Sequence, residues 1–166
     1  MRTLDVLVVG EAFVDFVPLH RGRLRESESF ELHSGGAPCN VAIGLARLGS
    51  RSALVSVVGD DEFGHFVRRA LDRDGVDTTA VRVEPGVQTG LCFITLDADG
   101  ERSFLHRGGD TAERLRADHF DLARVRAAGA VLFTASSLRQ PAGVAAIHKM
   151  IDHAGGLVCC DPGGTP

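Results

Sequence analysis

The stretch ELHSGGAPCNVAIGLARLG, residues 31–49, decides the fold, because two adjacent glycines stand directly ahead of a helical pattern. Gly35 and Gly36 have backbone freedom that is lost on folding, so their place before a helix indicates that another group must come close. Three explanations fit such a pair: a plain turn, a cradle for phosphate, or a backbone floor against which a neutral ligand lies.

The phosphate cradle has little support in this sequence. No Lys-Ser or Lys-Thr follows the glycines as a P-loop requires, and no G-x-G-x-x-G opens the helix. A dinucleotide-binding domain would need a glycine-rich turn directly after the first strand, which Gly10-Glu11-Ala12 does not provide. A structural turn and a ligand floor both stay open at this point.

Apolar runs alternate with helical patterns along the chain. Buried strands are expected at residues 4–9, 54–58, 130–134 and 157–160. Helices are expected at residues 38–48, 63–71 and 141–153, the second of them capped by Asp60 or Asp61 and ended by Gly75. In the first helix, Val41, Leu45 and Leu48 fall on one face. The alternation predicts an α/β fold with a largely parallel sheet flanked by helices.

Two pairs of segments break this alternation and predict β-hairpins. Residues 13–19 and 29–33 flank a polar stretch, and residues 89–96 and 102–107 flank the turn-forming sequence Asp97-Ala98-Asp99-Gly100. We therefore expect a small β layer that projects from the main sheet.

Composition narrows the class of protein. The chain has 166 residues, 44% of them hydrophobic, and a formal net charge of −4. Without a run of Lys and Arg, nucleic acid and anionic membranes are not expected as main partners. No stretch approaches the roughly 20 apolar residues of a membrane span, and Asp5 stands where a signal peptide would begin its apolar core. We expect a cytoplasmic location.

The four cysteines, Cys39, Cys92, Cys159 and Cys160, form no C-x-x-C pair. Their spacing therefore indicates neither a zinc site nor a disulfide framework, and buried reduced thiols are expected.

Polar residues around the glycine pair point to a ligand rich in hydroxyl groups. The amide of Asn40 both donates and accepts hydrogen bonds, and the carboxylate of Asp15 can accept from two neighbouring hydroxyls. Both residues are expected at the carboxyl ends of the strands, where open α/β sheets bind ligands. Arg107, at the end of the second hairpin, could swing onto such a ligand.

Each of these residues also has a structural explanation, and these alternatives stay open here. Asn40 could cap or brace its helix, Asp15 could be a solvated acid, and Arg107 could be an ordinary surface guanidinium.

Four stretches resemble, in order and spacing, the N-terminal half of the ribokinase/PfkB carbohydrate kinases. They are GEAFVDFVP (10–18), SGGAPCNVAIGLARLG (34–49), VVGDDEFGHFVRRALDRDGVDT (57–78) and TGLCFITLDADGERSFLHR (89–107). Within that family the sequence looks most similar to fructokinase, followed by 2-keto-3-deoxygluconate kinase.

The resemblance implies a Rossmann-like (ribokinase-like) sheet with a β lid formed by segments 13–33 and 88–107, often shared across a homodimer. It implies that Asp15, Gly35, Gly36 and Asn40 hold the sugar hydroxyls and that Arg107 contacts the substrate from the lid. Ser136 stands near a strand end that faces the sugar, although the match to the family is loose there.

The implied reaction transfers the γ-phosphoryl group of ATP to a sugar hydroxyl, with Mg²⁺ neutralising charge and an aspartate accepting the proton. The Gly-Ala-Gly-Asp signature that supplies this base in the family is absent from residues 1–166. No catalytic residue is therefore expected within this chain, and the base is expected beyond Pro166.

A second departure from the family pattern lies near the same end of the sequence. Gly163 stands where the family has the asparagine of Asp-Pro-Asn. We expect the chain to be the sugar-binding half of a kinase, with its C-terminal part missing. The alternative is an inactive sugar-binding or dimerisation remnant.

Overall fold

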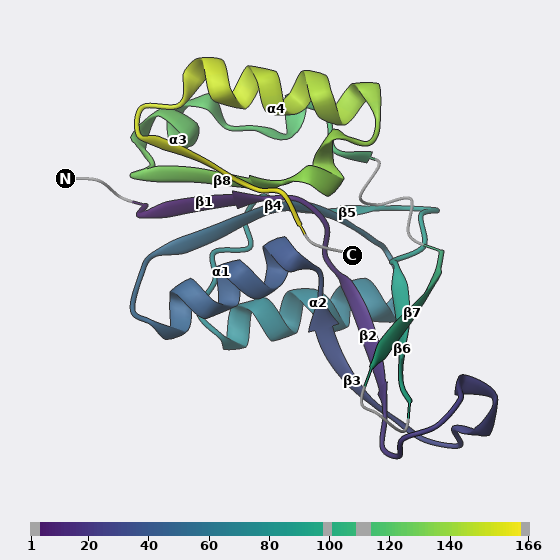
Figure 1. Ribbon diagram of the computed structural model, residues 1–166. Coiled ribbons are helices and arrows are strands. Elements are labelled where there is room, and N and C mark those ends of the chain that lie inside the picture. Colours follow the sequence, from purple (N-terminus) through teal and green to yellow (C-terminus); the bar gives the residue numbers. More distant parts are fainter. Residues whose placement is uncertain (1–3, 98–100, 109–113, 164–166) are drawn as a thin grey trace.

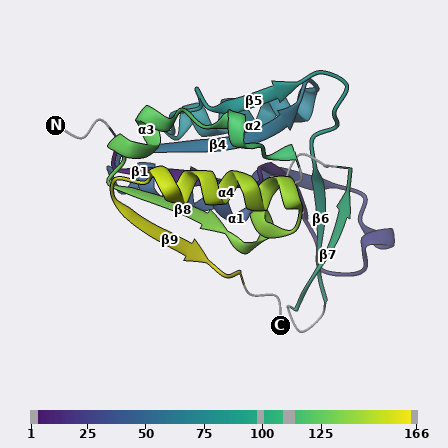
Figure 2. The same ribbon diagram turned by 90° about the horizontal axis from the view of Figure 1, so that it is seen from above.

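A computed structural model describes residues 4–97, 101–108 and 114–163. Its main sheet has five parallel strands in the order β5-β4-β1-β8-β9. Figure 2 shows β5 and β9 at opposite edges of this sheet. The strands are β1 (Val6–Val9), β4 (Ser52–Gly59), β5 (Val81–Glu84), β8 (Ala130–Thr134) and β9 (Leu157–Asp161).

Helices cover both faces of the main sheet (Figure 1). On one face lie α1 (Ala37–Arg47) and α2 (Glu62–Arg73), and on the other α3 (Leu122–Ala127) and α4 (Pro141–His153). Each layer encloses its own apolar cluster, one with Ala42 and Val67, the other with Val125 and Ile147. Short 3-10 turns span Leu24–Glu26, Ala117–His119 and Ala135–Leu138. Because β4 lies between both layers, all of its residues are buried.

A second sheet of four strands projects from one end of the main sheet (Figure 1). Its order is β3-β2-β6-β7, and the strands are β2 (Phe13–Pro18), β3 (Phe30–Gly35), β6 (Leu91–Leu96) and β7 (Arg102–Arg107). Both predicted hairpins are confirmed, since β2 pairs with β3 and β6 with β7, each antiparallel. Residues 98–100 of the predicted turn lie outside the described residues. We call these four strands the lid sheet.

The predicted α/β fold class is confirmed, and most predicted elements match the structure. The predicted cap of α2 is Asp61, whose side chain accepts from the backbone N–H of Gly64. Two elements were missed, β5 and α3, because they have only four and six residues and carry charged side chains that hide an apolar pattern.

The apolar face of α1 differs from the prediction. Cys39, Ala42 and Ile43 are buried against the sheet, whereas Leu48 is 84% exposed. Val41 and Leu45 are partly buried and pack against the same apolar cluster, so of the predicted face only Leu48 lies outside it.

The cysteines are free, and the prediction of buried thiols holds for Cys39 and Cys92 only. Cys159 is partly buried and Cys160 is exposed, because β9 is an edge strand. Among the described residues, no helix has both the length and the apolar character needed to cross a bilayer.

Candidate functional site

The main sheet has a point at which the order of its strands reverses. From β1 the chain continues outward through β4 and β5, and it later returns to fill β8 and β9 on the other side of β1. In open α/β sheets, ligands bind beyond the carboxyl ends of the strands at such a point. Glu11 follows β1 and Ser136 follows β8, so both residues stand there.

Gly35 lies directly beneath the carboxylate of Asp15. The two residues belong to the paired strands β3 and β2. A Cβ atom added at Gly35 would lie 2.4 Å from Oδ2 of Asp15 and 2.5 Å from its Cγ. Glycine is therefore required at this position to leave room for the carboxylate.

Gly36 has a different reason to be glycine. Its φ of +100° lies in the region that L-residues avoid, and an added Cβ would lie 2.6 Å from the carbonyl oxygen of Glu11. From this position it begins α1, and its carbonyl accepts a hydrogen bond of 2.9 Å from the backbone N–H of Asn40. The groups that approach the glycine pair are thus a carboxylate and a main-chain carbonyl of the protein itself.

Asp15 and Asn40 line one surface hollow of about 400 Å³ between the lid sheet and helices α1 and α2. Asn40 is exposed, and within the described part of the chain no hydrogen bond to its side-chain amide is seen. The polar residues around the hollow are Asp15, His33, Ser34, Asn40, Arg47, Arg73 and Asp74. The structure therefore brings together four of the predicted site residues, with the two glycines beneath Asp15 and at the start of α1.

Asp15 stands in a row of titratable side chains that crosses the lid sheet. Its register partners are His33 on β3 and Cys92 on β6, and Cys92 is opposite His106 on β7. Burial raises the pKa of Asp15, although the hydrogen bond from Cys92 and the nearby His106 and His33 oppose the rise. Burial also raises the pKa of Cys92 to about 11, helped by the charge of Asp15. The thiol therefore stays protonated and donates to the carboxylate.

Arg107 does not join this group. Its register partner is Leu91, whereas Asp15 and Cys92 are partners on the opposite face of the same sheet. The exposed Arg107 side chain donates to the carbonyl of His106, 3.0 Å away, and lines a different hollow of about 600 Å³ with Phe63 and Gln88. The β7 residue in register with Cys92, and so in this row, is His106.

Glu11 was missed as a site residue. Its Oε2 accepts from Ser136 Oγ at 2.5 Å and from Thr134 Oγ1 at 3.4 Å, so it ties the end of β1 to the end of β8. Glu11 and Asp15 both contribute to the high pKa of Cys39, about 12, which is chiefly due to burial. The signal was present in the sequence, because Glu11 is the second residue after the first predicted strand.

The Gly-Asp-Asp-x-Phe-Gly stretch holds the base of the lid sheet. Asp61 accepts from the backbone N–H of Gly64 at 2.8 Å, and from the backbone N–H and the hydroxyl of Thr89 at 2.8 and 2.7 Å. Thr89 also accepts from the backbone N–H of Gly59 at 2.9 Å. Burial would raise the pKa of Asp61, but these hydrogen bonds lower it below its usual range. We call this group the Asp61 clasp; it fixes the segment leading into β6 against α2.

The residues that would hold the ATP and Mg²⁺ implied by the family resemblance are expected mostly outside this chain, and that expectation stays a prediction. Within residues 4–97, 101–108 and 114–163, no three His, Cys, Asp or Glu side chains are grouped so that they could hold a metal ion. Asp161, at the end of β9, accepts from the backbone N–H of Gly163 at 2.9 Å. No step of a reaction is therefore assigned to a metal or nucleotide held by these residues.

The catalytic base was expected beyond Pro166, and that expectation stays a prediction. Pro166 itself lies outside the described residues, which end at Gly163. None of the described side chains is assigned the role of the base.

The parallel sheet flanked by helices matches ribokinase-like proteins of known structure. The sequence matches the model of the pfkB family carbohydrate kinases over residues 3–162. The chain belongs to this family.

Individual relatives agree with this assignment. Probable fructokinase-2 of Arabidopsis thaliana is 40% identical over 162 residues, which are 95% of this chain and 49% of that protein. A PfkB protein from Polaromonas sp. JS666, known from its crystal structure, is 31% identical in sequence. Its structure matches with a TM-score of 0.88 over 99% of this chain and 57% of that one.

A putative ribokinase II of E. coli has been solved in complex with ATP and Mg²⁺; it is 26% identical, with a TM-score of 0.85 over 98% of this chain and 54% of that one. The present chain spans about half the length of these relatives.

Proposed function

We propose that this chain is the sugar-binding half of an ATP-dependent carbohydrate kinase that phosphorylates a hydroxyl of a neutral, fructose-like sugar. The observation that carries the proposal is the Asp15 carboxylate seated over Gly35 in the same hollow as the exposed amide of Asn40. An ionised carboxylate accepts hydrogen bonds from two hydroxyls, and an amide accepts from one and donates to another. The two side chains together suit adjacent hydroxyls of a polyol.

The charges in the hollow favour a neutral sugar over a sugar acid such as 2-keto-3-deoxygluconate. Its two arginines, Arg47 and Arg73, lie 2.8 and 3.7 Å from the carboxylate of Asp74. Asp74 and Asp15 together balance these two positive charges, and Asp15 would repel a substrate carboxylate. The similarity to probable fructokinase-2 supports the same choice.

In the proposed reaction, this half binds and orients the sugar. Asp15 and Asn40 would fix the ring through its hydroxyls, and the lid sheet would shield the sugar from water when closed. The family resemblance implies that the second half supplies the catalytic base and the nucleotide site. A homodimer formed through the lid sheet stays a prediction.

Fructose binding to the purified chain, measured by calorimetry, tests the proposal. We expect Asn40→Ala to weaken fructose binding by about tenfold, because a hydrogen bond of about 1 kcal/mol is lost on each of one or two hydroxyls. Since Asn40 is exposed, the thermal unfolding temperature of the Asn40→Ala variant should match that of the parent. His65→Ala, an exposed change on α2 outside the hollow, is the control. Equal affinity of the parent and Asn40→Ala would assign Asn40 a purely structural role.

The placement of the base beyond Pro166 predicts a second outcome. The chain mixed with ATP and fructose should release no ADP above the blank, because phosphoryl transfer depends on positioning and neutralising the γ-phosphate. Clear turnover would contradict the division of labour between the two halves.

A further inference from the structure

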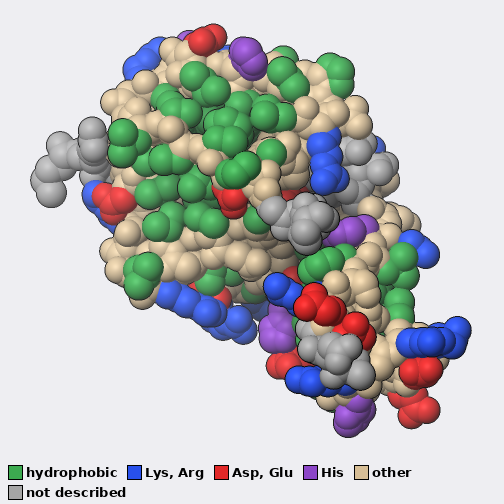
Figure 3. All heavy atoms as spheres, in the orientation of Figure 1, with side chains coloured by type: hydrophobic (Ala, Val, Ile, Leu, Met, Phe, Trp, Pro, Cys, Tyr) green, Lys and Arg blue, Asp and Glu red, His purple; other side chains and the backbone are tan. Residues whose placement is uncertain are grey.

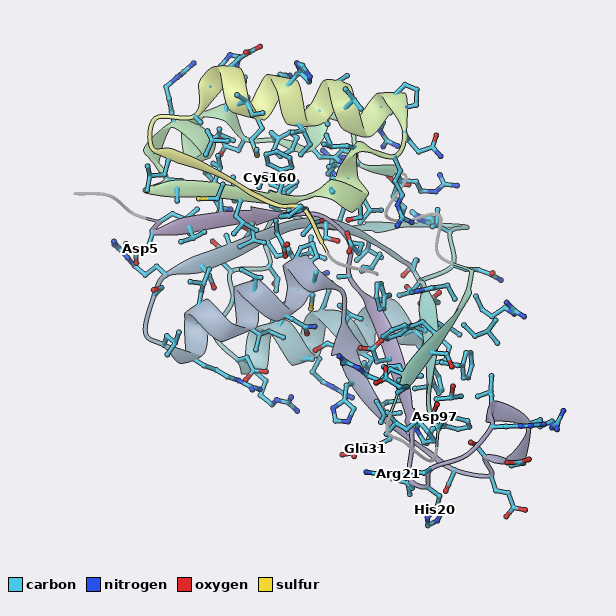
Figure 4. The ribbon with its side chains drawn as sticks, in the orientation of Figure 1. Asp5, His20, Arg21, Glu31, Asp97 and Cys160 are labelled. Carbon is cyan, nitrogen blue, oxygen red and sulfur yellow. The ribbon has the colours of Figure 1, made fainter. Side chains whose placement is uncertain are left out.

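The carboxylate of Asp15 is partly buried and has no cation paired with it. Within residues 4–97, 101–108 and 114–163, neither Lys nor Arg forms an ion pair with Asp15. In Figure 3, acidic and basic side chains gather toward the end of the lid sheet that lies far from the main sheet. Those that Figure 4 labels at this end are Arg21, Glu31 and Asp97. Because burial favours the neutral acid, the hydrogen-bond donors around Asp15 decide how far it stays ionised.

The thiol of Cys92 is the donor that the lid sheet places against this carboxylate. Cys92 is the register partner of Asp15 on the neighbouring parallel strand β6, so both side chains stand on one face of the sheet. The thiol is buried, with 1% of the residue exposed, and it donates a hydrogen bond to the carboxylate. A donor that bonds the charged form of an acid favours that form.

A second side chain holds the thiol from the other side. Nε2 of His106 lies 3.9 Å from Sγ of Cys92. Because the thiol hydrogen is directed to Asp15, we assign the hydrogen of this contact to Nε2, which donates to the sulfur. The His106 ring lies edge-on to Phe13, with the ring centroids 5.7 Å apart, and Phe13 belongs to β2 like Asp15. The row across β2, β6 and β7 is therefore braced at both ends by β2.

A cysteine beside a histidine can also be a nucleophile, but the surroundings of Cys92 do not suit that role. The nucleophile is the thiolate, and burial together with the charge of Asp15 raises the pKa of Cys92 to about 11. The side chain is also closed to solvent. The structure therefore favours a thiol that stays protonated and acts as a hydrogen-bond donor.

We propose that Cys92 is a positioning residue for the sugar, whose thiol holds the Asp15 carboxylate ionised and seated over Gly35 so that its remaining acceptor sites are left for the sugar hydroxyls. The inference rests on the proposed function, because it takes Asp15 as the group that binds those hydroxyls. An ionised carboxylate has about four acceptor sites, so one bond from the thiol leaves enough for two adjacent hydroxyls. A thiol is also neutral, so it adds no positive charge that would compete for the carboxylate.

Other ionisable groups face Asp15 from the neighbouring elements. Those that act on it or are acted on by it, besides Cys92, are His33 on β3, His106 on β7 and Cys39 on α1. Those that line the same hollow are Arg47, Arg73 and Asp74. Both histidines lower the pKa of Asp15 and so act in the same direction as the thiol. Cys39 forms its hydrogen bond with Ser34 instead.

Two measurements on the purified chain test the proposal. One is the titration of the Asp15 carboxyl group by NMR, with its signal identified by its loss in Asp15→Asn. The other is the affinity for fructose, measured by calorimetry over a range of pH. In Cys92→Ala the midpoint of the Asp15 titration should move to higher pH, and fructose binding at neutral pH should weaken by about fivefold. Binding should also be lost at a higher pH than in the parent as the pH falls.

Three further variants separate the hydrogen bond from the packing of the thiol. Cys92→Val fills the space without a donor and should behave like Cys92→Ala. Cys92→Ser keeps a donor and should restore both the titration and the affinity. Cys39→Ala removes a thiol that is also fully buried but bonds Ser34, so it should leave the Asp15 titration unchanged.

The outcomes distinguish this inference from the proposed function. If the parent binds fructose and the donor-free variants bind it equally well at every pH, the positioning role is wrong and the proposed function stands. An Asp15 titration that is the same in the parent and in both donor-free variants would also overturn the role of the thiol. If the parent binds no fructose, the proposed function fails and the positioning of a sugar by Cys92 fails with it.

Discussion

The carboxyl end of the main sheet and its β9 edge differ in how many of their backbone groups and side chains have partners within the protein. At the carboxyl end, Gly36 packs against the carbonyl of Glu11, and the Glu11 carboxylate accepts a hydrogen bond from Ser136. Asp61 accepts three hydrogen bonds. At β9, backbone groups and apolar side chains face outward without partners among the described residues. Substitutions in the first region should therefore lower the free energy of unfolding, whereas substitutions at a sheet edge should mainly change association with other chains.

The largest effect is expected at Gly36. Gly36→Ala places a Cβ 2.6 Å from a main-chain carbonyl at a φ of +100°. Since backbone cannot move aside cheaply and the conformation itself is strained, we expect the free energy of unfolding to fall by about 3 kcal/mol. Urea denaturation followed by circular dichroism measures this loss.

Gly44 provides the matched control for Gly36. It lies inside α1, the helix for which Gly36 is the N-cap, and an added Cβ would meet nothing within 4 Å. Gly44→Ala should therefore stabilise the protein by about 0.5–1 kcal/mol, because alanine favours the helix. If both substitutions had the same effect, the close packing at the carboxyl end would not be the cause of the damage.

A smaller effect is expected at the Asp61 clasp. Asp61→Ala removes the cap of α2 and leaves the backbone N–H of Thr89 without its acceptor. We expect a loss of about 2 kcal/mol in the free energy of unfolding. Hydrogen exchange should also rise at Thr89 and Gly90, where the chain enters the lid sheet, since the clasp fixes this segment.

The clasp also predicts a pH dependence. Because the pKa of Asp61 is lower in the folded protein than in the unfolded chain, the carboxylate stabilises the fold above its ordinary pKa of 3.8. This contribution is lost as the pH falls through the folded pKa. The difference in stability between the parent and Asp61→Ala should thus shrink below about pH 4. A constant difference down to about pH 2 would contradict the ionised clasp.

The sequence predicted those parts of the fold and site that depend on local pattern. Long apolar runs identified β1, β4, β8 and β9, and the glycine pair identified Asp15 and Asn40 as neighbours. It could not predict the face of a lid side chain, because that depends on the register between strands, and a shift of one residue exchanges His106 for Arg107. It also could not show that Gly35 accommodates Asp15, a contact that forms only when β2 and β3 pair.

The smallest effect on stability is expected at the β5 edge. Arg82 is exposed, and among the described residues its one hydrogen bond is that donated to the carbonyl of Asp118, 3.2 Å away. Arg82→Val should therefore change the free energy of unfolding by no more than about 0.5 kcal/mol. The substitution removes a charged side chain that keeps other strands from pairing with this edge. Like β9, β5 would then have no charge before its last residue. The variant should therefore associate more than the parent as its concentration rises.

Sedimentation velocity over a concentration series measures this association, and Arg82→Lys, which keeps the charge, is the control. If Arg82→Val sedimented like the parent at every concentration, charge on β5 would not be what distinguishes the two edges. The open surface at β9 would then have to be explained by its exposed leucine and valine alone. Association that appears in Arg82→Val and not in Arg82→Lys would show that one charged side chain separates a closed edge from an open one.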